Sequence, residues 1–257
     1  MSSDFSKLTA LVTTSSPKAT TRLLRSLDRY CVGVNSLVAT DEQLDGDSAT
    51  AVGVPDTRDV NTSRNALLAR VRTPYVLLLD DSMELTKKSQ VGQMLESAVT
   101  AKFDLLAGEL LSCTKSWGLF TKREPNPSHG IIQTQMPATG EKVEFQPKEL
   151  SGKTALPCDF TQSFLVARTD KLRALGGWTS ASPFDEREEL FLRAKRFGLQ
   201  VGLLPTSTAS RWVSDRRSNE DQKVAKLAAL SELGVSQVVD CEGNQLQVSS
   251  TQLSQAA

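Results

Sequence analysis

The segment TPYVLLLDDSMELT, residues 73 to 86, constrains the fold more than any other part of the chain. Its apolar run from Tyr75 to Leu79 changes abruptly to Asp80 and Asp81. A short unbroken apolar run is typical of a strand that is buried on both faces, as in a parallel sheet. Open α/β sheets bind ligands at the carboxyl ends of their strands. The segment therefore predicts a ligand site at the two acids, although Ser82 stands where another acid would complete an Asp-x-Asp metal motif.

Strand and helix patterns alternate around this segment. Short apolar runs at residues 8–13 and 32–39 predict strands, and the patterns from Pro17 onward and over residues 60–71 predict helices. Such alternation indicates a parallel sheet with helices on its faces. We expect one α/β domain over residues 1–235, with an irregular insertion at about residues 112–155, followed by a hairpin and a flexible tail over residues 236–257.

Composition excludes several other classes. The 257 residues, 39% of them hydrophobic, suffice for one sizeable core. Lys plus Arg equals Asp plus Glu at 30 each, so no net field favours nucleic acid as a partner. The four cysteines form no C-x-x-C pair, and no apolar stretch of about 20 residues predicts a membrane segment. We expect the chain as given to be cytoplasmic, or to lie in the Golgi lumen if a membrane anchor precedes it.

The chain contains the segment SRNALLARVRTPYVLLLDDSMELT and, later, CDFTQSFLVARTDKLRAL followed by FDEREELFLRAKRFGLQVGLLP. Together these segments resemble GT-A glycosyltransferases. The resemblance covers residues 8–212 and is strongest to family 2 enzymes and to the ganglioside β-1,4-N-acetylgalactosaminyltransferases. It implies a Rossmann-like α/β fold with a mostly parallel central sheet flanked by helices. The implied activity is inverting transfer of a hexosyl or N-acetylhexosaminyl group from a nucleoside-diphosphate sugar, UDP-sugar above all, to a hydroxyl of a glycan or glycoconjugate.

The resemblance also implies a donor site. In the family an Arg-Asn pair, here Arg64 and Asn65, precedes the acidic strand, Asp80 addresses the ribose, and Asp81 holds the metal or a metal-bound water. A departing diphosphate needs a cation to offset its charge. Because Ser82 and Arg211 replace a carboxylate and a histidine of the family's metal shell, we expect Mn²⁺ or Mg²⁺ binding to be weak or absent. Either a protein cation such as Arg211 replaces the metal, or catalysis has been lost. The residues alone also allow an acidic turn that caps the following helix.

The segment EREELFLRAK resembles the family pattern that carries the general base. The match places Glu189 at the base position and Glu188 before it, with Arg187 where the family has histidine. A carboxylate near the acceptor hydroxyl can accept its proton during displacement. The alternative is that both acids complement the dipole of a helix N-terminus. Similarly, Trp178 matches an acceptor-side turn at which an aromatic ring could stack on a sugar, but it could equally be a core residue.

The C-terminal part supports a second hypothesis. It contains TASRW, then a predicted charged helix over residues 216–233, and then LGVSQVVDCEGNQLQV. This arrangement resembles the GT-A-like stem domain of fukutin-related proteins. In those proteins the GT-A-like part is not the catalytic domain. The alternative function is therefore a catalytically silent GT-A-like domain that serves in binding or as a scaffold.

Overall fold

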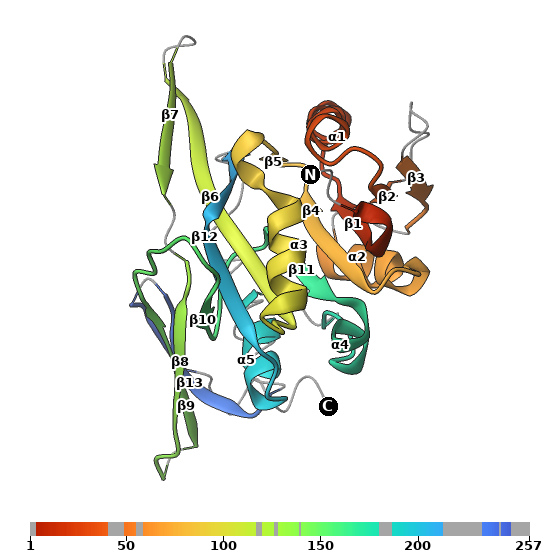
Figure 1. The fold of residues 1–257 in the computed structure, drawn as a ribbon. Coiled ribbons are helices and arrows are strands. Elements are labelled where there is room, and N and C mark those ends of the chain that lie inside the picture. Colours follow the sequence, from red (N-terminus) through yellow and green to blue (C-terminus); the bar gives the residue numbers. More distant parts are fainter. Residues whose placement is uncertain are drawn as a thin grey trace.

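The computed structural model describes residues 4–40, 49–54, 59–116, 120–125, 128–138, 140–179, 187–212, 233–241 and 243–247 (Figure 1). Its elements are η1 (Phe5–Lys7), β1 (Leu8–Thr13), α1 (Pro17–Tyr30), β2 (Asn35–Ala39), β3 (Ala49–Val52), α2 (Val60–Arg70), β4 (Tyr75–Asp80), β5 (Met83–Glu84), η2 (Lys87–Ser89), α3 (Val91–Thr100), β6 (Leu105–Ser116), β7 (Phe120–Pro125), β8 (Gly130–Gln135), β9 (Glu141–Pro147), β10 (Leu156–Cys158), β11 (Leu165–Arg168), α4 (Thr169–Ala174), α5 (Arg187–Arg196), β12 (Val201–Trp212), β13 (Val235–Val239) and β14 (Gln245–Gln247).

A mixed sheet forms the centre of the fold, with strand order β10-β12-β6-β11-β4-β1-β2-β3. The strands β4, β1, β2 and β3 are parallel neighbours, and β12 runs parallel to β6. Strand β11 lies antiparallel between β4 and β6. The parallel half confirms the prediction from strand and helix alternation, and it brings the carboxyl ends of β1, β2 and β4 to one edge of the sheet.

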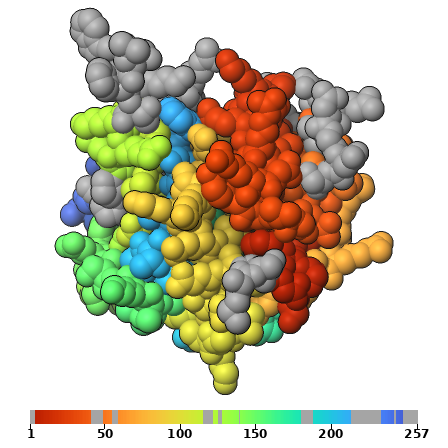
Figure 2. All heavy atoms as spheres, turned by 45° about the horizontal axis from the view of Figure 1, so that its top comes forward, coloured from red at the N-terminus to blue at the C-terminus, as the bar shows by residue number. Residues whose placement is uncertain are grey.

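Helices cover both faces of this sheet, and the alternation of buried residues along β4 shows how. Leu77 and Leu79 belong to a buried cluster with Leu23 of α1 and Met94 of α3. Successive side chains of a strand point to opposite faces, so α1 and α3 cover the face to which these leucines point. Figure 2 looks onto part of this face, where the red residues of α1 lie beside the gold and yellow segment from β5 to α3.

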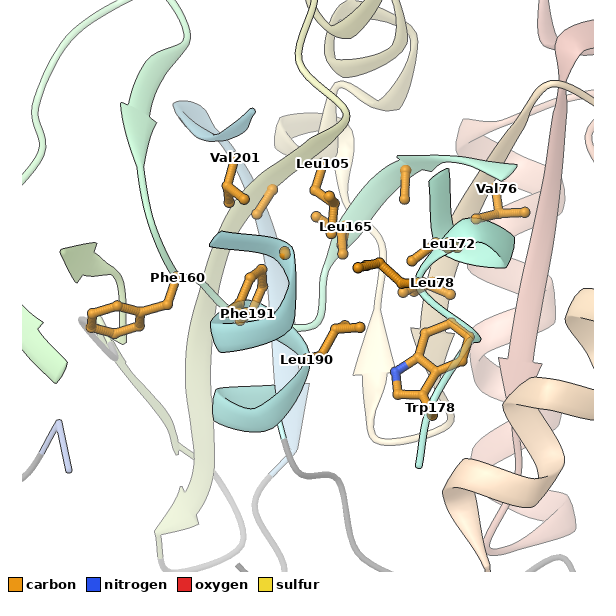
Figure 3. Close-up of a cluster of buried hydrophobic side chains, with 14 of the residues drawn as sticks. Val76, Leu78, Leu105, Phe160, Leu165, Leu172, Trp178, Leu190, Phe191 and Val201 are labelled. Carbon is orange, nitrogen blue, oxygen red and sulfur yellow. The ribbon is translucent and has the colours of Figure 1, made fainter. Parts of the chain in front are cut away.

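The other face of β4 lies against α2, α4 and α5. Leu78 belongs to a second buried cluster with Leu67 of α2, Leu172 of α4 and Leu190 of α5. Figure 3 shows Leu78, Leu172, Leu190 and Trp178 in this cluster. Trp178 is 4% exposed, so its ring is a core residue rather than a free stacking platform.

The predicted insertion is more regular than expected. Its described part contains the end of β6 and the strands β7, β8 and β9. Strand β7 pairs antiparallel with β6, and β8 pairs antiparallel with β9, where Ile132 lies opposite Phe145. Near the C-terminus, β13 and β14 pair antiparallel, and β13 pairs in parallel with β9. The hairpin therefore completes a second sheet with order β14-β13-β9-β8. The helix predicted over residues 216–233 falls almost wholly outside the described residues.

In the described part of the chain, no helix is both long and apolar enough to cross a membrane.

Candidate functional site

The two adjacent acids after the apolar run have separate environments. Asp80 is the last residue of β4, two positions after Leu78, so strand alternation directs it to the face covered by α2 and α5. Asp81 is 4% exposed and binds the start of α1, which lies on the opposite face. The Asp-Asp pair therefore contributes one carboxylate to each side of the sheet.

Both carboxylate oxygens of Asp81 accept hydrogen bonds from the β1–α1 connection and the first turn of α1. Its Oδ2 accepts from the backbone N–H groups of Ser15 and Ser16 at 2.6 and 2.8 Å and from the Thr20 hydroxyl at 3.4 Å. Its Oδ1 accepts from the Ser15 hydroxyl at 2.9 Å. A carboxylate at a helix N-terminus is stabilised by the exposed N–H groups and the helix dipole. In this arrangement Asp81 anchors the N-terminus of α1, the helix that precedes it in the chain.

Asp80 forms a tight turn with Ser82. Its Oδ1 accepts from the Ser82 backbone N–H at 3.0 Å and from the Ser82 hydroxyl. The side chain of Asp80 is half-buried, and Oδ2 accepts no hydrogen bond from any residue that the structure describes. Asp80 thus presents a carboxylate oxygen at the carboxyl edge of the sheet.

Arg211 lies beside the turn that follows Asp80. It pairs with Met83 across β12 and β5, and the neighbouring Trp212 N–H donates to the Ser82 carbonyl at 2.8 Å. The side chain of Arg211 is half-buried and forms no ion pair or hydrogen bond with the described residues. Strand pairing therefore places Arg211 opposite Met83, three residues after the predicted ribose-binding acid Asp80.

The donor set at this edge does not fit a divalent cation. Hard cations require several oxygen ligands, carboxylates above all. Asp81 is occupied by the start of α1, and Ser82 donates its hydroxyl to Asp80. Over the described ranges, no group of three or more His, Cys, Asp or Glu side chains is arranged to hold a metal ion.

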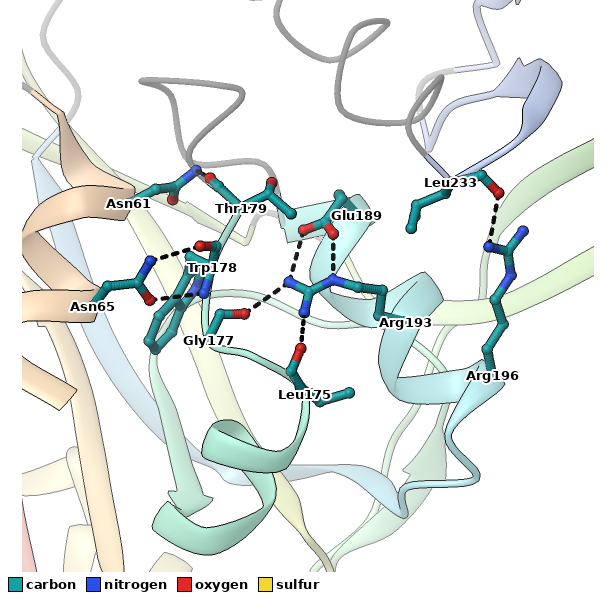
Figure 4. Close-up of polar contacts among 10 residues, drawn as sticks. All are labelled: Asn61, Asn65, Leu175, Gly177, Trp178, Thr179, Glu189, Arg193, Arg196 and Leu233. Atoms are coloured by element: carbon teal, nitrogen blue, oxygen red, sulfur yellow. Dashed lines mark hydrogen bonds and ion pairs between the residues drawn. The ribbon is translucent and has the colours of Figure 1, made fainter. Parts of the chain in front are cut away.

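One side of α2 binds the chain at residues 178–179 (Figure 4). The Asn65 amide donates to the Trp178 carbonyl at 2.6 Å and accepts from the Trp178 N–H at 2.9 Å. One turn earlier, Asn61 donates to the Thr179 carbonyl at 2.9 Å. Asn65, which was predicted to bind the nucleotide, therefore has a structural role, because both polar groups of its amide bind the Trp178 backbone.

Arg64 is also directed to this segment. It is 3% exposed, and its guanidinium carbon lies 5.5 Å from the centre of the Trp178 ring. A guanidinium over an indole face is attracted by the ring quadrupole. Trp178 thus lies between the core and the charged side chain of α2.

Glu189 is 2% exposed and is paired with Arg193, one turn later in α5. The guanidinium of Arg193 contacts both carboxylate oxygens, with Nη2 3.0 Å from Oε2. It also donates to the carbonyls of Leu175 at 2.5 Å and Gly177 at 2.8 Å (Figure 4). Glu189 and Arg193 therefore hold the same turn from α5 that Asn65 holds from α2.

Glu188 has a different environment. It is half-buried, and the Cys241 thiol of the C-terminal hairpin lies 4.0 Å from its Oε1. The structure thus places Asp80, Arg64 and Glu189 on the α2 and α5 side of the sheet, while Asp81 binds α1. Sequence reasoning gave no role to Arg193 or to Ser15. The Ser-Ser-Pro start of α1 and the four-residue spacing of Glu189 and Arg193 are the signals that could have indicated them.

Comparison with known proteins supports the fold assignment. No protein-family model and no curated protein matches the chain. Among solved structures, S. aureus TarS 1-349 is 14% identical with a TM-score of 0.58, over 88% of this chain and 65% of that one. The same fragment in complex with UDP is 15% identical, with a TM-score of 0.58 and the same coverage. GalNAc-T7 with UDP, GalNAc and Mn²⁺ is 8% identical with a TM-score of 0.61, over 87% of this chain and 48% of that one.

The chain spans less than two thirds of the length of each of these structures. The identities of 8 to 15% are low enough that these matches carry information about the fold alone. The architecture and these matches together show that the chain has the GT-A fold.

Proposed function

We propose that this protein is a glycosyltransferase that binds a UDP-sugar at the carboxyl edge of β4 and transfers the sugar to a hydroxyl of a glycan or glycoconjugate. The observation that carries the proposal is the position of Asp80, whose half-buried carboxylate ends a central parallel strand of a GT-A fold. Structures with this fold include proteins solved with UDP. A carboxylate at that edge can accept hydrogen bonds from ribose hydroxyls.

The donor diphosphate would be stabilised by protein cations in this proposal. Arg211 is the first candidate, because it is half-buried, pairs across β12 and β5 with Met83, three residues after Asp80, and has no ion pair within the described residues. Arg64 is the second candidate, positioned by the Trp178 ring. Guanidinium groups match phosphate oxygens in a bidentate geometry and stabilise the charge that develops on the leaving group. The reaction proposed here proceeds without a divalent metal.

Glu189 is our candidate general base for an inverting displacement. The acceptor hydroxyl would lose its proton to the carboxylate as its oxygen bonds to the anomeric carbon and the bond to the β-phosphate breaks. Arg193 contacts each oxygen of Glu189 once, and a carboxylate oxygen has a second lone pair. Glu188, half-buried on the same helix turn, is the alternative base.

A catalytically silent GT-A-like binding domain is the second candidate function. Two observations favour it, namely the engagement of Asp81 by the start of α1 and the engagement of Glu189 by Arg193. A domain that binds nucleotide without transferring sugar would need Asp80. It would not need the carboxylates of Asp81 and Glu189 to be accessible to a ligand.

An assay of UDP release from several UDP-sugars, with a panel of neutral and anionic glycan acceptors, separates the two functions. We expect acceptor-dependent UDP release that persists in EDTA and is lost in Asp80→Asn. Tight UDP binding without release from any donor would favour the silent domain. Release that requires added Mn²⁺ would overturn the metal-independent form of the proposal.

A further inference from the structure

A basic groove lies on the α1 side of the molecule, outside the residues discussed above. It is a cleft of about 800 Å³ between α1, β5 and β7. In Figure 2 the red residues of α1 and the gold residues near β5 come together on this face, with the yellow-green hairpin of β6 and β7 beyond them. Five basic side chains and one carboxylate line the groove, namely Lys18, Arg22, Arg25, Arg29, Arg123 and Glu84.

Four of these cations form a stripe along α1. Lys18, Arg22, Arg25 and Arg29 are spaced by four, three and four residues, which places them on one side of the helix. At 1.5 Å per residue the stripe is about 16 Å long. The opposite side of the helix is buried through Leu23 and Leu27. Like charges one turn apart destabilise a helix, so the stripe has an energetic cost that a ligand would relieve.

Within the described residues, only one of the four cations of the stripe, Arg22, has an ion-pair partner, the Glu84 carboxylate. Arg25 and Lys18 are exposed and form no ion pair with any residue of the described ranges. Across the whole chain acids and bases balance at 30 each, so the groove is a local concentration of charge rather than part of a general one. Arg123 faces the stripe from β7, which gives the groove cations on two walls.

Arg22 connects the groove to the turn after β4. Its Nη2 donates to the Asp81 carbonyl at 3.4 Å, and its guanidinium carbon lies 5.2 Å from the centre of the Trp212 ring. Its Nε lies 4.0 Å from the Glu84 carboxylate and has no hydrogen-bond acceptor in the described part of the chain. An arginine held by an aromatic face is preorganised to bind an anion. The groove therefore begins next to the Asp80 turn and extends along α1.

We infer that this groove binds an anionic glycan chain whose phosphate or sulfate groups contact the arginines of α1. Guanidinium forks match both oxyanions, and the length of the stripe suits a chain with repeated charges. Leu85 and Tyr30 are the larger apolar side chains of the lining, which is too little to hold acyl chains of a lipid. That the anionic glycan is the sugar acceptor rests on the proposed function. That the glycan binds in the groove does not depend on the proposed function.

Binding of dextran sulfate and phosphorylated dextran, compared with neutral dextran of the same length, tests the inference. We expect the protein to bind the two anionic chains and not the neutral one, and affinity to fall at least tenfold in Arg25→Gln/Arg29→Gln. The matched control is Arg70→Gln/Arg72→Gln, which removes two exposed arginines at the end of α2 and should change affinity less than twofold. Equal loss in both variants, or no loss in the groove variant, would overturn the inference.

Two further probes separate other polyanions. Vesicles of phosphatidylglycerol and phosphatidylcholine, or single-stranded poly-uridine RNA, would overturn the glycan assignment if they bound through Arg25 and Arg29 while the anionic dextrans did not. Calorimetric titration of the groove variant with UDP distinguishes this inference from the proposed function. We expect its UDP affinity to equal that of the wild type, so either proposal can fail while the other stands.

Discussion

Asp81 accepts hydrogen bonds from both the backbone N–H and the hydroxyl of Ser15, at 2.6 and 2.9 Å. These contacts join the end of β4 to the start of α1 across the edge of the sheet. The neighbouring Asp80 keeps one carboxylate oxygen without a hydrogen bond from the described residues. Two adjacent acids with the same chemistry thus have different roles, because strand alternation separates their side chains.

This difference predicts that two isosteric substitutions change the stability of the protein by different amounts. Asp81→Asn replaces the charged acceptor of several N–H and O–H groups, so we expect the free energy of unfolding to fall by about 1 to 3 kcal/mol. Asp80→Asn should leave the stability nearly unchanged, since Asp80 is half-buried and, among the described residues, its side chain accepts hydrogen bonds from Ser82 alone. Urea denaturation of both variants measures the difference. Equal stability of the two variants would show that the Asp81 contacts contribute little.

The turn before α5 offers a second comparison, between two glycines that both have a positive φ. Gly176 and Gly177 have φ of +83° and +74°, which disfavour any side chain. A Cβ at Gly177 would lie 2.3 Å from the Asn65 Oδ1, whereas one at Gly176 would meet nothing within 4 Å. We expect Gly177→Ala to lower the thermal midpoint more than Gly176→Ala. The additional loss in the free energy of unfolding should be about 1 to 2 kcal/mol. Identical midpoints would mean that Asn65 does not fix this turn.

Much of the fold was predictable from sequence, because local patterns determine it. Strand β1 and the start of α1 at Pro17 have the predicted bounds, since an apolar run and a proline at the first helical turn are strong local signals. Strand β2 begins at Asn35 rather than at Val32, because Gly33 adopts φ of +85° in the turn before it. The second sheet was missed, because pairing of β13 with β9 depends on residues about 95 positions apart.

The site was predictable only in part, for a related reason. Sequence indicated that Asp80 ends a buried strand, and the structure confirms that position. It could not show that Asp81 binds Ser15 or that Asn65 binds Trp178, because those contacts join residues 66 and 113 positions apart. The nucleotide-binding and catalytic roles of the predicted site residues stay predictions.

Substitution of the two acids of α5 tests the proposed base. Glu189→Gln breaks a buried ion pair with Arg193, so we expect the free energy of unfolding to fall by about 3 to 5 kcal/mol. We also expect sugar transfer to fall by about 10²- to 10⁴-fold at a temperature where the variant is folded, as circular dichroism can verify. Glu188→Gln is the control, with an unchanged thermal midpoint and retained transfer. Loss of transfer in Glu188→Gln alone would assign the base to Glu188.

The single histidine predicts a pH dependence of stability. Burial lowers the pKa of His129 below its ordinary value of 6.5, and its Nε2 has no hydrogen-bond partner among the residues that the structure describes. The unfolded chain therefore binds a proton near pH 6.5 that the folded chain does not bind until lower pH. Stability contributed by neutral His129 is present above pH 6.5 and is lost as the pH falls below it, by at most about 1.4 kcal/mol per pH unit. Thermal midpoints between pH 7.5 and 5.5 should fall in the wild type and fall less in His129→Gln. A parallel decrease in both proteins would contradict this assignment.

Calorimetric titration with UDP, in EDTA and in Mn²⁺, tests the central claim that the Asp80 edge of this GT-A fold binds a nucleoside diphosphate without a metal. We predict that the wild-type protein binds UDP with affinities that agree within about threefold in the two buffers, because Asp81 and Ser82 leave too few ligands for a cation. Asp80→Asn should weaken binding at least tenfold while its thermal midpoint is unchanged. Absence of UDP binding to the wild type at millimolar concentration, or binding that occurs only with Mn²⁺, would contradict the account.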